Sequence, residues 1–153
     1  MTNNIKLATR KSPLALAQAN MVKNFLIDNG VFDKVDLLSM STSGDTVDNK
    51  IFKKKGGKGL FLKELENALL DGEADIAVHS MKDVPAKLDK RFNISSIMER
   101  EDPRDVFISD KHKTLSDIET GIIGSSSPRR QAIIKHINSN IKSKEIRGNI
   151  QTR

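Results

Sequence analysis

The feature that most constrains the fold is an alternation of strand-like and helix-like segments along the chain. Branched and apolar residues predict short strands at 5–9, 35–40, 74–78, 94–98, 106–108, 122–124 and 144–147. Apolar residues recur at helical spacing after Ser12, from 60 to 70 and after Ser127, with a weaker helix near Leu115. Strands that alternate with helices favour parallel sheets covered by helices, so the predicted fold class is α/β.

Two of the helices are predicted to start with the same local signal, a serine followed by a proline. Ser12–Pro13 and Ser127–Pro128 each offer a capping hydroxyl and a residue suited to the first helical position. Gly30 can end the first helix. The apolar side of that helix is predicted to comprise Leu14, Ala17, Met21, Val22, Phe25 and Leu26.

A change of amino-acid composition at 99–105 indicates that the chain crosses there from one domain to another. Those seven residues comprise six charged side chains and a proline, and therefore cannot form a core strand. We expect a first α/β domain at 1–99, a crossing at 100–105 and a partial second α/β domain at 106–153. A second irregular segment runs from Ser41 to Gly59 and carries three closely spaced glycines, so 43–58 is predicted to be a mobile lid.

The most suggestive chemical feature is the pair Lys82–Asp83, which follows the strand predicted at 74–78. Pro85 disfavours helix at Val84, so the pair is expected in a loop. In open α/β sheets, ligands bind outside the carboxyl ends of the strands. A carboxylate there can act as an acid, a base or a stabiliser of a cation. A solvated surface turn is the alternative reading of the pattern.

Several cationic residues also fall where predicted elements end. Arg129 and Arg130 lie in the first turn of a helix, where cations oppose the helix dipole and a bound anion would remove the conflict. Arginine forks suit carboxylates and phosphates, although any single arginine can equally be a surface residue. The net charge of +6 agrees with a cleft for a multiply negative ligand. The cations concerned are Arg10, Arg129, Arg130, Arg147 and Arg153.

Other classes of site find little support in the sequence. The chain contains no cysteine, so it offers no disulfide, thiolate metal site or cysteine nucleophile. The three histidines lack zinc-ligand spacing, and we predict no metal. No P-loop surrounds Lys58 and no nucleophile elbow surrounds Ser126. We also expect no nucleic acid, because interleaved aromatic residues are absent, and no membrane, because no apolar run has the length of a span.

Five segments resemble motifs of the porphobilinogen deaminase (hydroxymethylbilane synthase) family. They occur in that family's order and at its spacing, and the resemblance covers essentially the whole chain. The segments are Leu7–Ala15, Gly56–Phe61, Ala74–Pro85, Glu99–Asp105 and Arg147–Asn149.

The resemblance implies domains that are similar to periplasmic ligand-binding proteins of type II, with mostly parallel sheets. It implies a transferase of haem biosynthesis that joins four porphobilinogen molecules head to tail, with loss of ammonia, to give hydroxymethylbilane. The partners would be porphobilinogen and the growing polypyrrole chain. The family's dipyrromethane cofactor is attached to a cysteine of a third domain, and that cysteine is not in this chain.

Residue by residue, the resemblance assigns roles to the positions that match the family's motifs. Asp83 matches the catalytic aspartate, which would hold pyrrole N–H groups and stabilise the cation formed when ammonia leaves. The positions expected to bind carboxylates of cofactor or substrate are Arg10, Ser12, Lys58, Lys82, Ser126, Ser127, Arg129, Arg130, Arg147 and Arg153.

Two departures from the family's pattern affect these expectations. Pro128 stands where the family usually has leucine, and proline is tolerated in a first helical turn. The family is also about twice as long, so we expect an N-terminal fragment that stops within the second domain, lacks the third and is inactive alone. A cytoplasmic monomer is the expected context. The alternative function is a non-catalytic anion-binding module of the periplasmic-binding type.

Overall fold

The structure, a computed structural model, describes residues 3–42, 62–146 and 148–153 of the chain. It divides into two compact units, Met1–Met98 and Glu99–Arg153. Each unit contains its own parallel sheet, so the predicted α/β class is confirmed. Among the described residues, no helix combines the length and the apolar character needed to cross a membrane.

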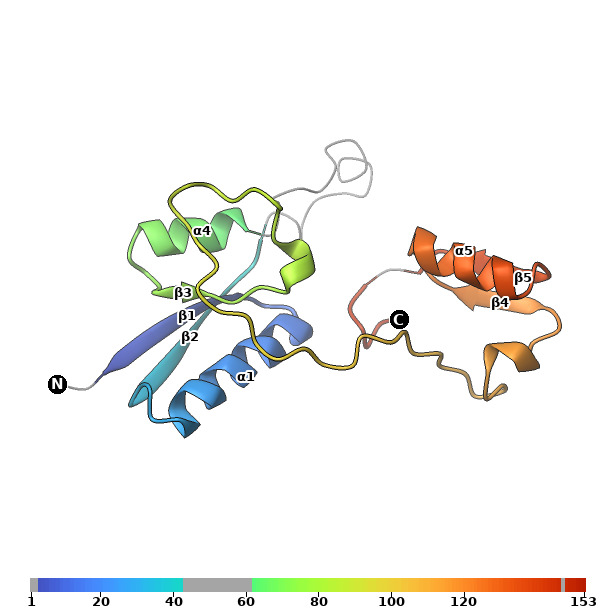
Figure 1. Cartoon of the computed structure of the whole chain (residues 1–153), viewed down its shortest axis with the longest axis horizontal. Helices are drawn as coiled ribbons and strands as arrows, with labels where there is room; N and C mark the ends of the chain where they lie inside the picture. Colours follow the sequence, from blue (N-terminus) through green and yellow to red (C-terminus); the bar gives the residue numbers. More distant parts are fainter. Residues whose placement is uncertain (1–2, 43–61, 147) are drawn as a thin grey trace. The chain divides into compact units, whose positions relative to one another are not determined.

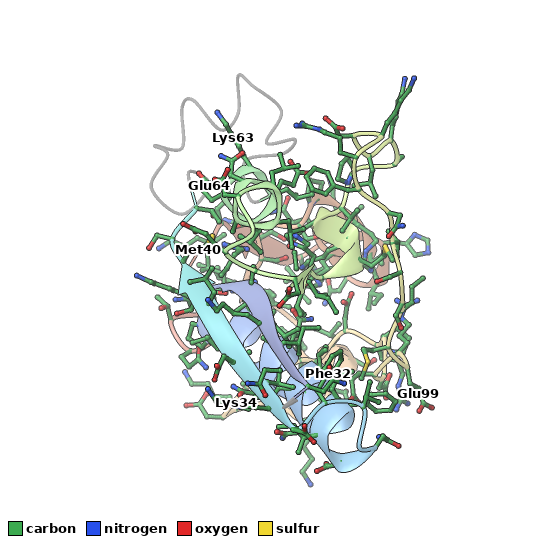
Figure 2. All side chains as sticks on the ribbon, turned by 90° about the vertical axis from the view of Figure 1, so that its left-hand side faces the viewer. Phe32, Lys34, Met40, Lys63, Glu64 and Glu99 are labelled. Atoms are coloured by element: carbon green, nitrogen blue, oxygen red, sulfur yellow. The ribbon has the colours of Figure 1, made fainter. Side chains whose placement is uncertain are left out.

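The first unit is built on a parallel sheet in the order β2-β1-β3. Its strands are β1 (Asn4–Arg10), β2 (Lys34–Met40) and β3 (Ile76–Ala77). Helices α1 (Pro13–Asp28) and α4 (Lys63–Leu70) cover opposite faces of the sheet (Figure 1). Figure 2 shows Lys34 and Met40 at opposite ends of β2, with Lys63 and Glu64 of α4 on the Met40 side. This layering puts the central strand β1 between two apolar clusters.

Alternate residues of β1 supply these two clusters, as expected for a strand buried on both faces. On the α1 face, fully buried Leu7 packs with Ile5 and Val35. On the α4 face, Ala8 packs against Leu65, and Ala68 and Ala74 complete the cluster. The small side chain of Ala8 leaves room for Leu65, which is also fully buried.

The local signals at both ends of α1 are confirmed. The Ser12 hydroxyl accepts a hydrogen bond from the Ala15 N–H at 3.3 Å, and Pro13 occupies the first helical turn. After the helix, Gly30 adopts φ +64°, a left-handed conformation that glycine tolerates best. The start and the end of α1 therefore follow from residues within one turn of each boundary.

The predicted apolar side of α1 is only partly correct. Val22 and Leu26 pack against the α1-face cluster, but Leu14, Met21 and Phe25 are 43%, 46% and 51% exposed. The helix carries apolar residues around much of its circumference, so its sequence does not select one face. The sheet instead contacts the side that presents Ala19, which is fully buried and permits a close approach.

Two predicted strands are wrong in the described structure. The segments 94–98 and 106–108 form no strand, and Ile97, Val106 and Ile108 are 71%, 82% and 88% exposed. Their branched residues favour an extended backbone, but a strand also needs a partner with which to form hydrogen bonds. The strand predicted at 74–78 is shortened to β3, although the Val78 N–H still donates to the Ala8 carbonyl at 2.9 Å.

The second unit is a smaller arrangement of the same kind. Strands β4 (Gly121–Gly124) and β5 (Ile141–Lys144) pair in parallel and are connected by α5 (Pro128–Ile137). Ile118, Ile134 and Ile141 form its core. The last strand was predicted at 144–147 but lies three residues earlier, because Ile141 is the residue that reaches the core. The weak helix near Leu115 is a single 3₁₀ turn, Leu115–Asp117.

Candidate functional site

The first group of candidate residues gathers at the carboxyl edge of the first sheet. Ala8 of β1 pairs with Ala77 of β3 in a parallel register, so the segments that follow the two strands emerge at the same edge. Arg10 ends β1 and Ser12 caps α1 there, while Lys82 and Asp83 follow β3. The structure therefore brings four of the predicted site residues to one edge of the first unit.

Lys82 and Asp83 lie in a 3₁₀ turn, Met81–Asp83, which is held by its own backbone. The Asp83 N–H donates to the Ser80 carbonyl at 2.9 Å, and the Val84 N–H donates to the Met81 carbonyl at 3.1 Å. Asp83 is half-buried whereas Lys82 is exposed. The turn thus presents an aspartate with a defined backbone beside an exposed lysine, whose long side chain can adjust its position to a ligand.

A side-chain hydrogen bond attaches this turn to the first helix. The Ser80 hydroxyl donates to Oε1 of Gln18 at 2.8 Å, across 62 residues of sequence. The start of α1 is itself attached to β1, because the Thr9 hydroxyl donates to the Ala15 carbonyl at 3.2 Å. Sequence reasoning missed both Gln18 and Ser80, since the identity of a polar residue in a helix or a loop does not indicate its tertiary partner.

His79 is half-buried shortly after β3, where the charges of Arg10 and Asp83 both act on it. Burial is the main cause that lowers the pKa of its imidazole below the usual 6.5, and the charge of Arg10 lowers it further. The charge of Asp83 acts in the opposite direction and raises it. The imidazole therefore senses both Arg10 and Asp83, and the structure favours its neutral form at neutral pH.

We expect the stability of the protein to fall on the acid side of neutrality partly because of His79. The unfolded imidazole binds a proton more readily than the folded one, so stability rises with pH up to the unfolded pKa near 6.5 and falls below it. Urea denaturation gives the free energy of unfolding at pH 5 and at pH 7.5. The difference between the two values should be smaller in His79→Gln than in the unmodified protein. A His79 pKa at or above 6.5 by NMR would contradict this.

The second group of candidate residues lies at the start of α5, in the other unit. The Ser127 hydroxyl caps the helix and accepts from the Arg130 N–H at 3.4 Å. Ser125 is buried, and its carbonyl accepts from the Gln131 side chain at 2.6 Å. The Ser126 hydroxyl donates to the Ile146 carbonyl. These bonds hold the serine segment in place, so the hydroxyls of Ser126 and Ser127 have structural partners and are also candidate ligand groups.

Arg129 and Arg130 converge on a single carboxylate, that of Asp105. Nη2 of Arg129 lies 2.8 Å from Oδ2 of Asp105, and Nη2 of Arg130 lies 2.9 Å from Oδ1. Nε of Arg130 donates to the same Oδ1 at 3.0 Å. Hydrogen bonds from Arg130 and then from Arg129 lower the pKa of Asp105, so it is ionised at neutral pH. The sequence predicted that an anion would relieve these cations, but not that the protein supplies one.

The remaining candidate residues are less constrained or fall outside the described ranges. Arg153 is exposed, and its N–H donates to the Asn149 carbonyl at 3.1 Å. Lys58, Arg147 and the lid predicted at 43–58 lie outside the described residues. Among the residues that the structure describes, no group of three His, Cys, Asp or Glu side chains could hold a metal ion.

Comparison with known proteins adds an independent line of information. Residues 5–153 match the family model described as porphobilinogen deaminase, dipyromethane cofactor binding domain. The porphobilinogen deaminase of Rickettsia canadensis is 46% identical over 158 residues, which cover 100% of this chain and 51% of the relative. That of Albidiferax ferrireducens is 46% identical over 152 residues, which cover 99% of this chain and 48% of the relative. The chain thus spans about half the length of the curated relatives it matches.

Proposed function

Because the chain belongs to the porphobilinogen deaminase family, we propose that it forms the N-terminal part of a longer transferase. That enzyme condenses four porphobilinogen molecules head to tail, with loss of one ammonia from each, to give hydroxymethylbilane for haem biosynthesis. The observation that carries the proposal is the half-buried Asp83 in a defined turn at the carboxyl edge of a parallel sheet. Without it, the same edge would be only a place where anions bind.

Asp83 is assigned the central chemical role. Loss of ammonia from porphobilinogen leaves a positive charge on the pyrrole unit, and a nearby carboxylate stabilises that charge as it develops. The carboxylate also accepts hydrogen bonds from pyrrole N–H groups, which orients the ring. The backbone bond from Asp83 to Ser80 and the bond from Ser80 to Gln18 support this role, because they order the turn before the substrate arrives.

The cationic residues are assigned to the acidic side chains of the substrate. Each porphobilinogen carries an acetate and a propionate, so the growing polypyrrole chain is a polyanion that suits arginine forks. In the first unit we assign this role to Arg10, Ser12 and Lys82, and in the second to Ser126, Ser127, Arg129 and Arg130. Lys58, Arg147 and Arg153 are assigned by their match to the family's motifs.

The described residues fit the dipyrromethane cofactor that the family model names. Its carboxylates require exposed cations and hydroxyl donors, and Lys82, Arg129 and Arg130 supply exposed cations. When bound, the cofactor supplies the pyrrole end from which the chain grows. Its attachment in the family requires a thiol, and this chain contains no cysteine, so we propose that the thiol lies in another part of the longer protein.

The organisation of the protein is proposed on the same basis. We propose a first domain at 1–99, a crossing at 100–105 and part of a second domain at 106–153. The division of the chain after Met98 supports the first boundary. A cytoplasmic monomer without nucleic-acid or membrane partners is the proposed context.

The proposal is tested by assaying the longer protein and the isolated 153-residue chain with porphobilinogen. The longer protein is expected to release four ammonia molecules for each linear tetrapyrrole that it forms. The isolated chain is expected to show no turnover, because it has no thiol to hold the cofactor. Sustained turnover by the isolated chain would refute the requirement for a cysteine that holds the cofactor. Anion binding by the longer protein without ammonia release would instead favour the alternative, a non-catalytic anion-binding module.

A further inference from the structure

We infer that Asp105 is a positioning residue, which holds Arg129 and Arg130 together as one binding site for a substrate carboxylate. The inference rests on the proposed function, because it concerns how the enzyme recognises the acidic side chains of porphobilinogen. It gives Asp105 a role that neither the sequence patterns nor the assignments above include. The observations that support it all lie within the second unit, Glu99–Arg153.

The first observation is the shape of the contact. One oxygen of Asp105, Oδ1, is within 3.1 Å of Nη2 of Arg129, Nε of Arg130 and Nη2 of Arg130. The other oxygen, Oδ2, lies 2.8 Å from Nη2 of Arg129. Since a guanidinium carries five N–H donors, the two side chains keep donors on Nη1 for a second acceptor. Asp105 thus occupies one side of the arginine pair and leaves another available.

The second observation concerns charge. Arg129 and Arg130 are consecutive residues in the first turn of α5, where their charges repel each other and oppose the helix dipole. One carboxylate placed against both side chains removes most of this conflict, yet the three residues together keep a net charge of +1. The cluster therefore still attracts an anion, and the shared carboxylate holds its two guanidinium groups close to each other.

The third observation is that Asp105 is itself held in place. Phe107, two residues along the chain, packs against the core formed by Ile118, Ile134 and Ile141. The side chain of Asp105 is 37% exposed, less than those of Arg129 and Arg130 at 61% and 45%. A carboxylate held in this way orders the two longer arginine side chains. Their rotamer entropy is therefore lost before the ligand binds, and the loss does not weaken binding.

The same charged segment provides a matched control. Asp102 pairs with Arg104, only two residues away, through a bond of 2.9 Å between Nε of Arg104 and Oδ1 of Asp102. That pair is also exposed and ionic, and its hydrogen bonds among the described residues join Asp102 and Arg104 to each other. Asp102→Asn therefore removes a comparable charge without disturbing the arginine pair.

The test compares Asp105→Asn, Asp105→Glu and Asp102→Asn in the longer protein. Asp105→Asn is expected to raise KM for porphobilinogen about three- to tenfold with little change in kcat, since exposed ion pairs have modest energies. Asp105→Glu should recover most of the affinity, and Asp102→Asn should match the unmodified protein. An unchanged or lower KM in Asp105→Asn would overturn the inference, because it would make Asp105 irrelevant to the ligand or a competitor of it.

A second measurement does not depend on activity. The Arg130 Nε–H is expected to give a slowly exchanging NMR signal in the unmodified longer protein and a rapidly exchanging one in Asp105→Asn. Rapid exchange in the unmodified protein would overturn the inference even if the variant failed to fold. Failure of the proposed function is recognised separately, as absence of ammonia release by the unmodified longer protein.

Discussion

Replacing Asp83 by asparagine in the longer enzyme is expected to lower turnover by about 10²–10³-fold. The asparagine side chain keeps the size of the aspartate but removes the negative charge that stabilises the cation as ammonia leaves. Loss of a group that stabilises charge in a transition state typically costs about 3–4 kcal/mol, which corresponds to this factor. The backbone bond from the Asp83 N–H to the Ser80 carbonyl does not depend on the side chain, so the turn should persist.

The measurement is the rate of ammonia release at saturating porphobilinogen, together with a thermal unfolding curve for each variant. Asp89→Asn serves as a matched control, because Asp89 is six residues away and pairs with Arg91 at 2.8 Å on an exposed surface. The control should retain normal turnover. Near-normal turnover in Asp83→Asn would remove Asp83 from its assigned role, whereas equal losses in both variants would indicate a general effect of charge.

Replacing Leu65 by alanine is expected to destabilise the first unit by about 2–5 kcal/mol, as is typical for buried leucines. Leu65 is fully buried and packs against Ala8 of β1, with Ala68 and Ala74 beside it. The buried side chains beside it are alanines, which are too short to fill the cavity that the shorter residue leaves, while the larger Leu38, Met40 and Leu69 are only partly buried. A loss of this size is a large fraction of the total stability of a small domain.

Leu70→Ala on the same helix is the matched control, because Leu70 is 46% exposed and should lose far less stability. Urea denaturation of the 153-residue chain followed by far-UV circular dichroism suits this comparison, since the chain contains neither Trp nor Tyr. The midpoint for Leu65→Ala should lie well below that for Leu70→Ala. Equal midpoints would show that the α4-face cluster contributes little to the stability of this unit.

The predictions that were confirmed depend on short stretches of sequence. A serine followed by a proline specified the starts of α1 and α5, because the capping hydroxyl bonds to an N–H only three residues away. The position of Asp83 just after β3 was also predictable, since the strand and Pro85 both lie close to it in sequence. The segments 94–98 and 106–108 were mispredicted because a strand requires a partner that no local pattern specifies.

What the sequence alone determined is therefore the type and order of most elements, the parallel α/β class and the family to which the candidate residues point. Which polar groups meet depends instead on the packed fold. Ser80 bonds to Gln18 across 62 residues, and Arg129 and Arg130 reach Asp105 across 24 and 25 residues. The physical reason is that caps and turns are satisfied by neighbours in the chain. Contacts between distant side chains exist only after the sheet and its helices have packed.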